Sequence, residues 1–263
     1  MTVSYVADRA SAGTNTDATS FGPTVTPGAA GRLLIATFAW GRGSSLSDAL
    51  SGIAGTLSVV DESGAAGWTV FSELAVPNNN TRLVTCYGYS VSTSPGTILA
   101  TFPAAQGNCS WKVSEYSASD GQARVDLTNI SEYSGPSANP TLTLPSSLRA
   151  GSIVHTALGH NNTSVGISQP TDFTSIGSKI SRSSPTVAHT GAYEETSPPS
   201  SFSWIVSGAN GKVAIGFEIY DYVAPAGGTS AKWWDGSTVA DATLKWWDGS
   251  TLVDVTDMAW HSS

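Results

Sequence analysis

Apolar and polar residues alternate with a period of two along most of the chain, which is the pattern of β-strands. Leu33, Ile35 and Thr37 alternate with Leu34, Ala36 and Phe38, and residues 83–89 follow the same rule. Turn dipeptides separate such segments, among them "PG" at 27–28 and 95–96, "SG" at 63–64 and "PP" at 198–199. Short strands at this spacing predict an all-β fold, built as a sandwich or a jelly roll. Only residues 45–55, "SLSDALSGIAG", have helical spacing.

The strand pattern occurs twice in the same order. "AAGRLLIATFAWG" (29–41) matches "RAGSIVHTALGHN" (149–161), and "AGWTVFSEL" (66–74) matches "TDFTSIGSK" (171–179). "CYGYSVSTSPGTILATF" (86–102) matches "TGAYEETSPPSSFSWIV" (190–206), and "VSEYSA" (113–118) matches "GFEIYD" (216–221). These matches pair Trp68 with Phe173, Tyr89 with Tyr193 and Glu115 with Glu218. The matches predict two copies of one β unit, of which only the first has the 45–55 segment.

The repeat therefore predicts two tandem, jelly-roll-like β-sandwich units, followed by a small C-terminal hairpin region. We place the first repeat at 1–118 and the second at 119–222. Residues 223–230, "VAPAGGTS", have the composition of a linker, and residues 231–263 form a tryptophan-rich tail.

The tail contains a second, closer repeat. Residues 232–243 and 245–256 agree at 9 of 12 positions, and each copy has two adjacent tryptophans before Asp-Gly. Asp-Gly favours a type I′ hairpin turn, which would place Trp233 opposite Thr238 on one face and Trp234 with Val239 on the other. Isolated hairpins are marginal in water, so these side chains need a cover. The candidate assembly or ligand contacts are Trp233, Trp234, Asp235, Gly236, Trp246, Trp247, Asp248, Gly249 and Trp260.

Three roles fit the paired tryptophans. Packing between chains is favoured, because tryptophan is a frequent interface anchor. Closing a small local core comes second, and stacking on sugar rings comes third.

Composition and charge narrow the function classes. Charged residues are only 12% of the 263 residues, and the net charge is −8. No basic patch is present to neutralise phosphates, which argues against nucleic acid and anionic membrane surfaces as partners. The N-terminal "MTVSYVADRASAG" lacks the basic and apolar regions of a signal peptide, so we expect synthesis in a cytoplasm.

No catalytic or metal constellation is recognisable in the sequence. His155, His160, His189 and His261 have no counterparts between the repeats, and we expect the histidines to be solvated or hydrogen-bonded rather than ligands. The five-residue spacing of His155 and His160 places them on opposite faces of a strand. Glu115 and Glu218 occupy equivalent positions, which predicts the same structural task twice, such as accepting hydrogen bonds from a loop. We therefore expect no enzyme activity, no cofactor and no metal.

Cys86 and Cys109 are the only cysteines. A disulfide between neighbouring strands is one arrangement. Buried free thiols are favoured for a chain that folds in a reducing compartment.

The tail repeat "KWWDGST…VDVT" resembles the "K-x-W-D/N-G-S-x-W-V" hairpins at the C-termini of virion proteins of tailed bacteriophages, notably minor tail proteins. "AAGRLLIATFAWG", "VVDESGAAGWT" and "WKVSEYSA" are similar to strands and turns of a β-sandwich repeat in phage and bacterial surface proteins. One departure is that Thr238-Val239 and Thr251-Leu252 stand where that tail pattern has a tryptophan after the turn.

The resemblance implies a non-enzymatic structural protein of a phage virion, located at the tail or tail tip. Its implied partners are other virion proteins, further copies of the chain in a homo-oligomer, and a host cell-surface glycan. Capsid decoration or a head fibre is the alternative within this class. A carbohydrate-binding module of a secreted protein or adhesin is the alternative from another class.

Overall fold

The computed structural model describes the chain except for several short segments. The described residues are 2–41, 48–76, 81–136, 139–162, 164, 166–183, 186–208 and 211–223 in the body, and 231–234, 239–242, 245–247 and 252–254 in the tail. The chain divides into two units, residues 1–222 and residues 223–263. We call them the body and the tail.

The central strands of the body are apolar along their whole length because both of their faces are buried. In β4 (Leu33–Gly41), every residue is buried. Leu33 and Ile35 belong to one core, whereas Leu34 and Phe38 belong to another. The alternation in the sequence therefore separates two cores rather than a core and solvent.

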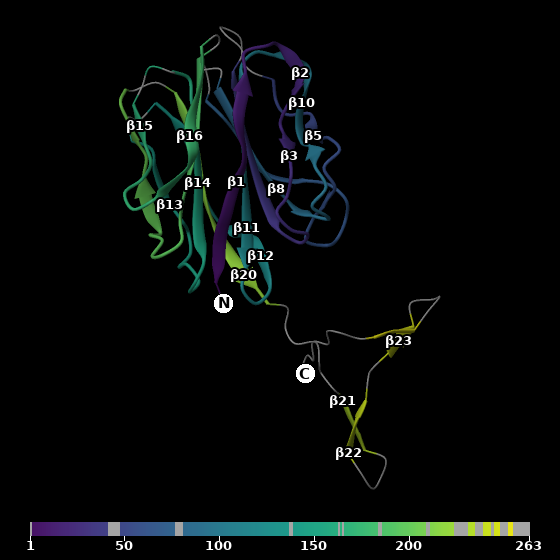
Figure 1. Ribbon diagram of the computed structural model, residues 1–263. Helices are drawn as coiled ribbons and strands as arrows, with labels where there is room; N and C mark the ends of the chain where they lie inside the picture. The colour runs from purple at the N-terminus through teal and green to yellow at the C-terminus, as the bar shows by residue number, and fades with distance from the viewer. Residues whose placement is uncertain are drawn as a thin grey trace. The chain divides into compact units, whose positions relative to one another are not determined.

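Two antiparallel sheets form the centre of the body (Figure 1). The first sheet has the order β1 (Val3–Thr14), β11 (Cys109–Ala118), β4, β8 (Thr81–Ser90), with β6 (Val59–Val60) and β7 (Thr69–Ala75) both pairing with β8. The second has the order β12 (Gln122–Gly135), β20 (Lys212–Tyr222), β14 (Ile153–His160), β17 (Thr186–Glu194), β16 (Thr174–Ser183). The described residues are all-β, with two multi-strand antiparallel sheet regions. The finer prediction of jelly-roll repeats stays a prediction.

The two sheets pack face to face through a shared core, which we call the central core. Its residues come from both sheets, for example Leu33 and Leu83 from the first and Ile153 and Ile215 from the second. Smaller sheets cover the outer face of each central sheet. Figure 1 shows β2, β3, β5 and β10 on one side of the body, and β13 and β15 on the other.

The small sheets on the first side close the first outer core. They are β2 (Ala18–Phe21), β10 (Leu99–Gln106) and β5 (Gly52–Ala54), and the pair β3 (Thr24–Val25) and β9 (Gly96–Thr97). On the other side, β13 (Thr141–Thr143) pairs with β18 (Ser201–Ser203), and β15 (Ile167–Ser168) with β19 (Ile205–Val206), closing the second outer core.

The two halves share one topology. The order β1-β11-β4-β8-β7 corresponds strand by strand to β12-β20-β14-β17-β16. The edge contacts are also equivalent, because β1 lies against β16 and β12 lies against β7. Exchanging the two halves turns the contact of β1 with β16 into that of β12 with β7, as happens across the two-fold axis of a dimer.

Two details of the sequence prediction are wrong. Tyr87 lies opposite Ile35, and Tyr193 lies opposite His155, so Tyr193 corresponds to Tyr87 rather than Tyr89. The helical spacing of residues 45–55 gives no helix in its described part. There, Gly52–Ala54 is strand β5, whose backbone pairs with β10.

Candidate functional site

The tail forms two hairpins with the same register. β21 (Ala231–Trp234) pairs with β22 (Val239–Ala242), and β23 (Lys245–Trp247) pairs with β24 (Leu252–Asp254). Trp234 lies opposite Val239, with which it was expected only to share a face, and Trp233 lies opposite Ala240 and not opposite Thr238. The expected pairing assumed a two-residue turn, whereas four residues separate the paired Trp234 and Val239.

The candidate contact residues of the tail are only partly described. Trp233, Trp234, Trp246 and Trp247 lie in hairpin strands. Asp235, Gly236, Asp248, Gly249 and Trp260 lie outside the described residues. Adjacent positions of a strand belong to opposite faces, so each ribbon has a tryptophan position on both faces. Among the described strands, each hairpin is a separate two-stranded sheet.

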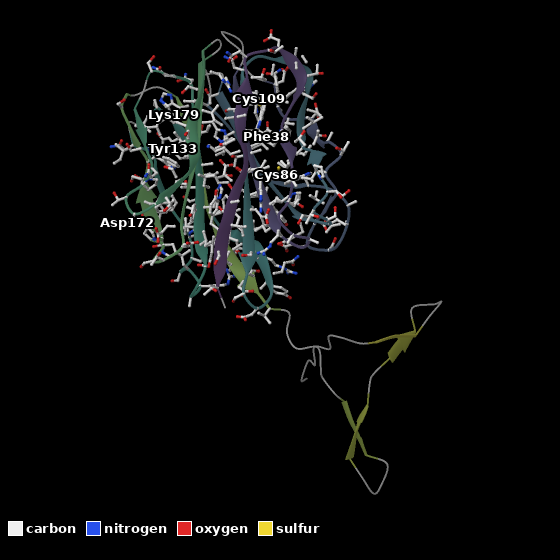
Figure 2. The ribbon with its side chains drawn as sticks, viewed as in Figure 1. Phe38, Cys86, Cys109, Tyr133, Asp172 and Lys179 are labelled. Atoms are coloured by element: carbon white, nitrogen blue, oxygen red, sulfur yellow. The ribbon has the colours of Figure 1, made fainter. Side chains whose placement is uncertain are left out.

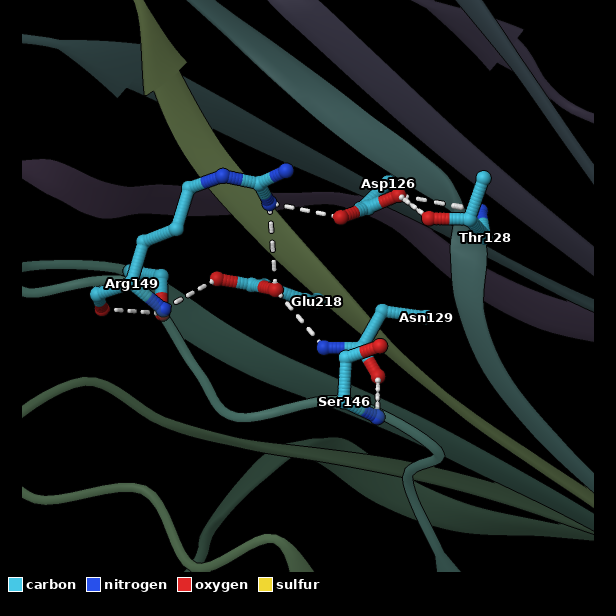
Figure 3. Close-up of polar contacts among 7 residues, drawn as sticks. Asp126, Thr128, Asn129, Ser146, Arg149 and Glu218 are labelled. Atoms are coloured by element: carbon cyan, nitrogen blue, oxygen red, sulfur yellow. Dashed lines mark hydrogen bonds and ion pairs between the residues drawn. The ribbon is translucent and has the colours of Figure 1, made fainter.

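Glu115 and Glu218 perform the same structural task in the two halves. Glu115 Oε2 accepts hydrogen bonds from the Arg9 side chain at 2.5 Å and from the backbone N–H of Gly28 at 2.9 Å. Glu218 accepts from Asn129 Nδ2 at 2.8 Å and from the backbone N–H of Arg149 at 2.7 Å (Figure 3). Both carboxylates are buried and bind the loop before a central strand. This confirms the structural prediction made from their repetition.

The network around Glu218 extends to a second carboxylate. Arg149 also reaches Asp126 Oδ2 at 2.6 Å, and its guanidinium lies 3.9 Å from the ring centre of Tyr220. Burial alone would raise the pKa of Asp126. Hydrogen bonds from Thr128 and the contact with Arg149 hold that pKa below its ordinary value. The carboxylates of Glu218 and Asp126 are thus both paired with the Arg149 guanidinium.

The described histidines are buried rather than solvated. His155 Nδ1 lies 2.6 Å from the Tyr116 hydroxyl, and its ring stacks on Phe217 at 4.9 Å. His189 Nε2 lies 3.0 Å from Thr37 Oγ1. His160 Nδ1 accepts from the backbone N–H of Asn162 at 2.8 Å. The expectation of hydrogen bonding is confirmed for these three, that of solvation is wrong, and His261 lies outside the described residues.

Burial keeps these imidazoles neutral. It lowers the pKa of His155 to about 3 and that of His160 to about 4. The pKa of His189 falls well below its ordinary value, through burial first and the nearby Lys112 second. One ring nitrogen of each has no hydrogen-bond partner among the described residues.

Lys112 is the charged member of the central core. Its ammonium donates to Ser11 Oγ at 2.7 Å, to the carbonyl of Ile176 at 2.6 Å and to that of Ser178 at 2.9 Å. Burial lowers its pKa to about 8, against the opposing effect of Asp8. The side chain thereby connects β11 with both β1 and β16.

Five buried residues with polar side-chain groups on the inner faces of the two sheets have apolar counterparts in the other half of the body. By strand register, Lys112, His155, His189, Thr37 and Tyr116 correspond to Ile215, Ile35, Leu83, Ala157 and Ile219. All five counterparts are buried and apolar. The alignment of the two repeats did not predict these five residues. Lys112 within "WKVSEYSA" could have indicated them, because it is a charged residue inside an apolar strand.

The cysteines are buried free thiols, as favoured from the sequence. Cys86 and Cys109 belong to the first outer core together with Phe38 (Figure 2). Burial raises the pKa of both thiols.

No three His, Cys, Asp or Glu side chains of the described part of the chain are grouped to hold a metal ion. No helix within it is long and apolar enough to cross a membrane.

Comparison with known proteins gives no matching family model, no matching curated protein and no matching solved structure. The resemblance to phage virion proteins therefore stays a prediction.

Proposed function

We propose that this chain is a non-enzymatic structural component of a tailed-phage virion, at the tail or tail tip. In this proposal residues 1–118 and 119–222 are two β-sandwich repeats of a rigid body. The tail hairpins dock onto other virion chains, including further copies of this one.

The observation that carries the proposal is the repeated hairpin. Each of the two hairpins, which have one register, contains adjacent tryptophan positions, and adjacent positions of a strand belong to opposite faces of the sheet. A two-stranded ribbon cannot cover both of its faces, and each tryptophan presents a large apolar surface. In this proposal a partner chain covers the tryptophans, which explains why the hairpin occurs twice.

The buried polar groups of the body also support the proposal, because they join separate parts of the fold. Glu115, Glu218 and Lys112 each connect separate strands or loops through hydrogen bonds. Such cross-links favour a rigid scaffold.

The first test compares the molecular mass in solution of three proteins by light scattering. They are the full chain, a chain ending at Ala224, and a full-length variant with Trp233, Trp234, Trp246 and Trp247 changed to alanine. We expect a defined oligomer for the full chain and monomers for the other two. Three monomers, or an oligomer that survives the four substitutions, would contradict docking through the tail.

The second test locates the chain in a particle. An antibody against the body, applied to phage particles made by the encoding genome, should label the tail tip. Label on the head would instead select capsid decoration or a head fibre, and unlabelled particles would reject the virion role.

A further inference from the structure

The body has an open groove beside Trp68. Its volume is about 340 Å³, at the small end of the range of about 300–1,000 Å³ for ligand sites. It is lined by Ile53, Ala54, Gly55, Leu57, Ser58, Val59, Val60, Ala66, Gly67, Trp68 and Val91.

The groove belongs to the segment by which the two halves differ. The connection from β4 to β7, residues 42–68, is about twice as long as residues 161–173 between β14 and β16. The longer connection contains β6, which pairs with the end of β8 and has no counterpart among the described strands of the second sheet. Asp61 Oδ1 fixes the turn after β6 by accepting from the N–H groups of Ser63 and Ala65. The first sheet thus holds the wall that contains Val59 and Val60, and β5 of the small sheet holds the wall that contains Ile53 and Ala54.

Trp68 is more exposed than its counterpart in the second half. Phe173 is 4% exposed and packs on Phe202 within the second outer core. Trp68 packs against the first outer core but is only half-buried, and it lines the groove. Gly88 allows β6 to approach β8 closely beside Trp68, because a Cβ at position 88 would lie only 3.0 Å from Val59 Cβ.

The polar groups of the groove are few and uncharged. The polar groups on its lining side chains are the indole N–H of Trp68 and the hydroxyl of Ser58. The lining contains no ionisable side chain, although the chain as a whole has a net charge of −8. The groove therefore matches a neutral ligand with one apolar face and hydroxyl groups at its edge.

We propose that this groove binds a neutral pyranose unit of a glycan. The C–H face of the sugar ring stacks on Trp68, and sugar hydroxyls bond with the indole N–H and with Ser58. The inference does not depend on the tail, because every lining residue belongs to the body.

The test uses the full chain and four probes: the methyl glycosides of glucose, galactose, mannose and N-acetylglucosamine. Saturation-transfer NMR detects binding, and tryptophan fluorescence gives the affinity. We expect at least one glycoside to bind at millimolar concentration. Trp68→Ala should weaken that binding about fivefold, since stacking contributes on the order of 1 kcal/mol. Ser58→Ala should weaken it by a smaller factor.

The controls separate the groove from the fold. Leu127→Ala removes an exposed apolar residue of the second half, and Ser94→Ala removes an exposed hydroxyl outside the groove. Both should bind like the parent chain. Trp68→Phe introduces the residue that the second half has at this position and should give an intermediate affinity, which keeps the test valid should Trp68→Ala not fold.

Three results would overturn the proposal: no binding by any of the four glycosides, binding that Trp68→Ala and Trp68→Phe leave unchanged, or saturation of the groove by a phenylalanine peptide without competition from any sugar. The molecular mass of the same proteins reports on the tail separately. Failure of sugar binding and failure of tail docking are therefore distinguishable.

Discussion

A lysine ammonium is stable inside a protein core only where acceptors replace the water that it has lost. Lys112 finds three such acceptors, and two of them are backbone carbonyls on either side of Gly177. Gly177 has a φ of +57°, and a Cβ there would lie 2.3 Å from Asp8 Oδ2. A glycine in the left-handed region thus gives the ammonium its site.

His155 makes stability sensitive to acid. Its pKa is about 3 in the folded chain, below the ordinary value of 6.5 expected after unfolding. The unfolded chain therefore binds more protons throughout that window, and the free energy of unfolding falls as the pH drops from 6.5 towards 3. At about pH 5 the loss through this one group is about 2 kcal/mol.

The measurement is urea unfolding of the parent chain and His155→Gln at about pH 7 and pH 5. Glutamine can bond with the Tyr116 hydroxyl but does not titrate. We expect the parent chain to lose about 2 kcal/mol more than the variant between the two pH values. Equal losses would show that His155 is not the group that responds.

At the scale of elements, irregular strands bring polar side chains to the buried glutamates. The pairing of β1 with β11 shifts register between Asp8 and Ala10, which leaves Arg9 as an extra residue. The pairing of β12 with β20 shifts between Val125 and Ile130, so Asn129 lies in the irregular part. A bulge redirects a side chain without ending the strand, and both halves use one for the same purpose.

Glu218→Gln should destabilise the body by about 2 kcal/mol, because it removes the charge that Arg149 and Asn129 surround. Chemical denaturation measures the change. Glu62→Gln is the matched control: Glu62 is a half-exposed carboxylate 3.8 Å from Arg124, and its loss should cost about 0.5 kcal/mol or less. Equal effects of the two substitutions would contradict the structural role of Glu218.

Strands and repetition were predictable from the sequence because each depends on local pattern. The period of two, the turn dipeptides and the repeated Glu115 and Glu218 all belong to short segments. The central core depends on residues far apart, as with Tyr116 and His155, and no local pattern pairs them. The groove beside Trp68 depends on β6 and Val91, which meet only after β8 is paired.

At the scale of the whole molecule, the shared central core makes the body one cooperative structure. Leu83 and Ile153 come from different halves yet belong to the same core. Neither half can unfold without exposing the inner face of the other, which favours a single transition.

Calorimetry of two variants tests this cooperativity. Ile153→Ala alters the central core, and Leu142→Ala alters the second outer core. Each should cost about 2–5 kcal/mol and shift one transition of the whole body to lower temperature. Two transitions, of which only one moves in Leu142→Ala, would mean that residues 1–118 and 119–222 unfold independently.

The approximate two-fold axis lies within a single chain, and this changes how the body can evolve. In a dimer of identical chains, one codon change alters both sides of the axis at once, so a buried lysine would enter the core twice. Here Lys112 and Ile215 are encoded separately, although they occupy equivalent positions. The single chain also keeps the two halves together at a high effective concentration. Each half was thereby free to acquire buried polar residues where the other half has apolar ones: Lys112 in the first half, and His155 and His189 in the second.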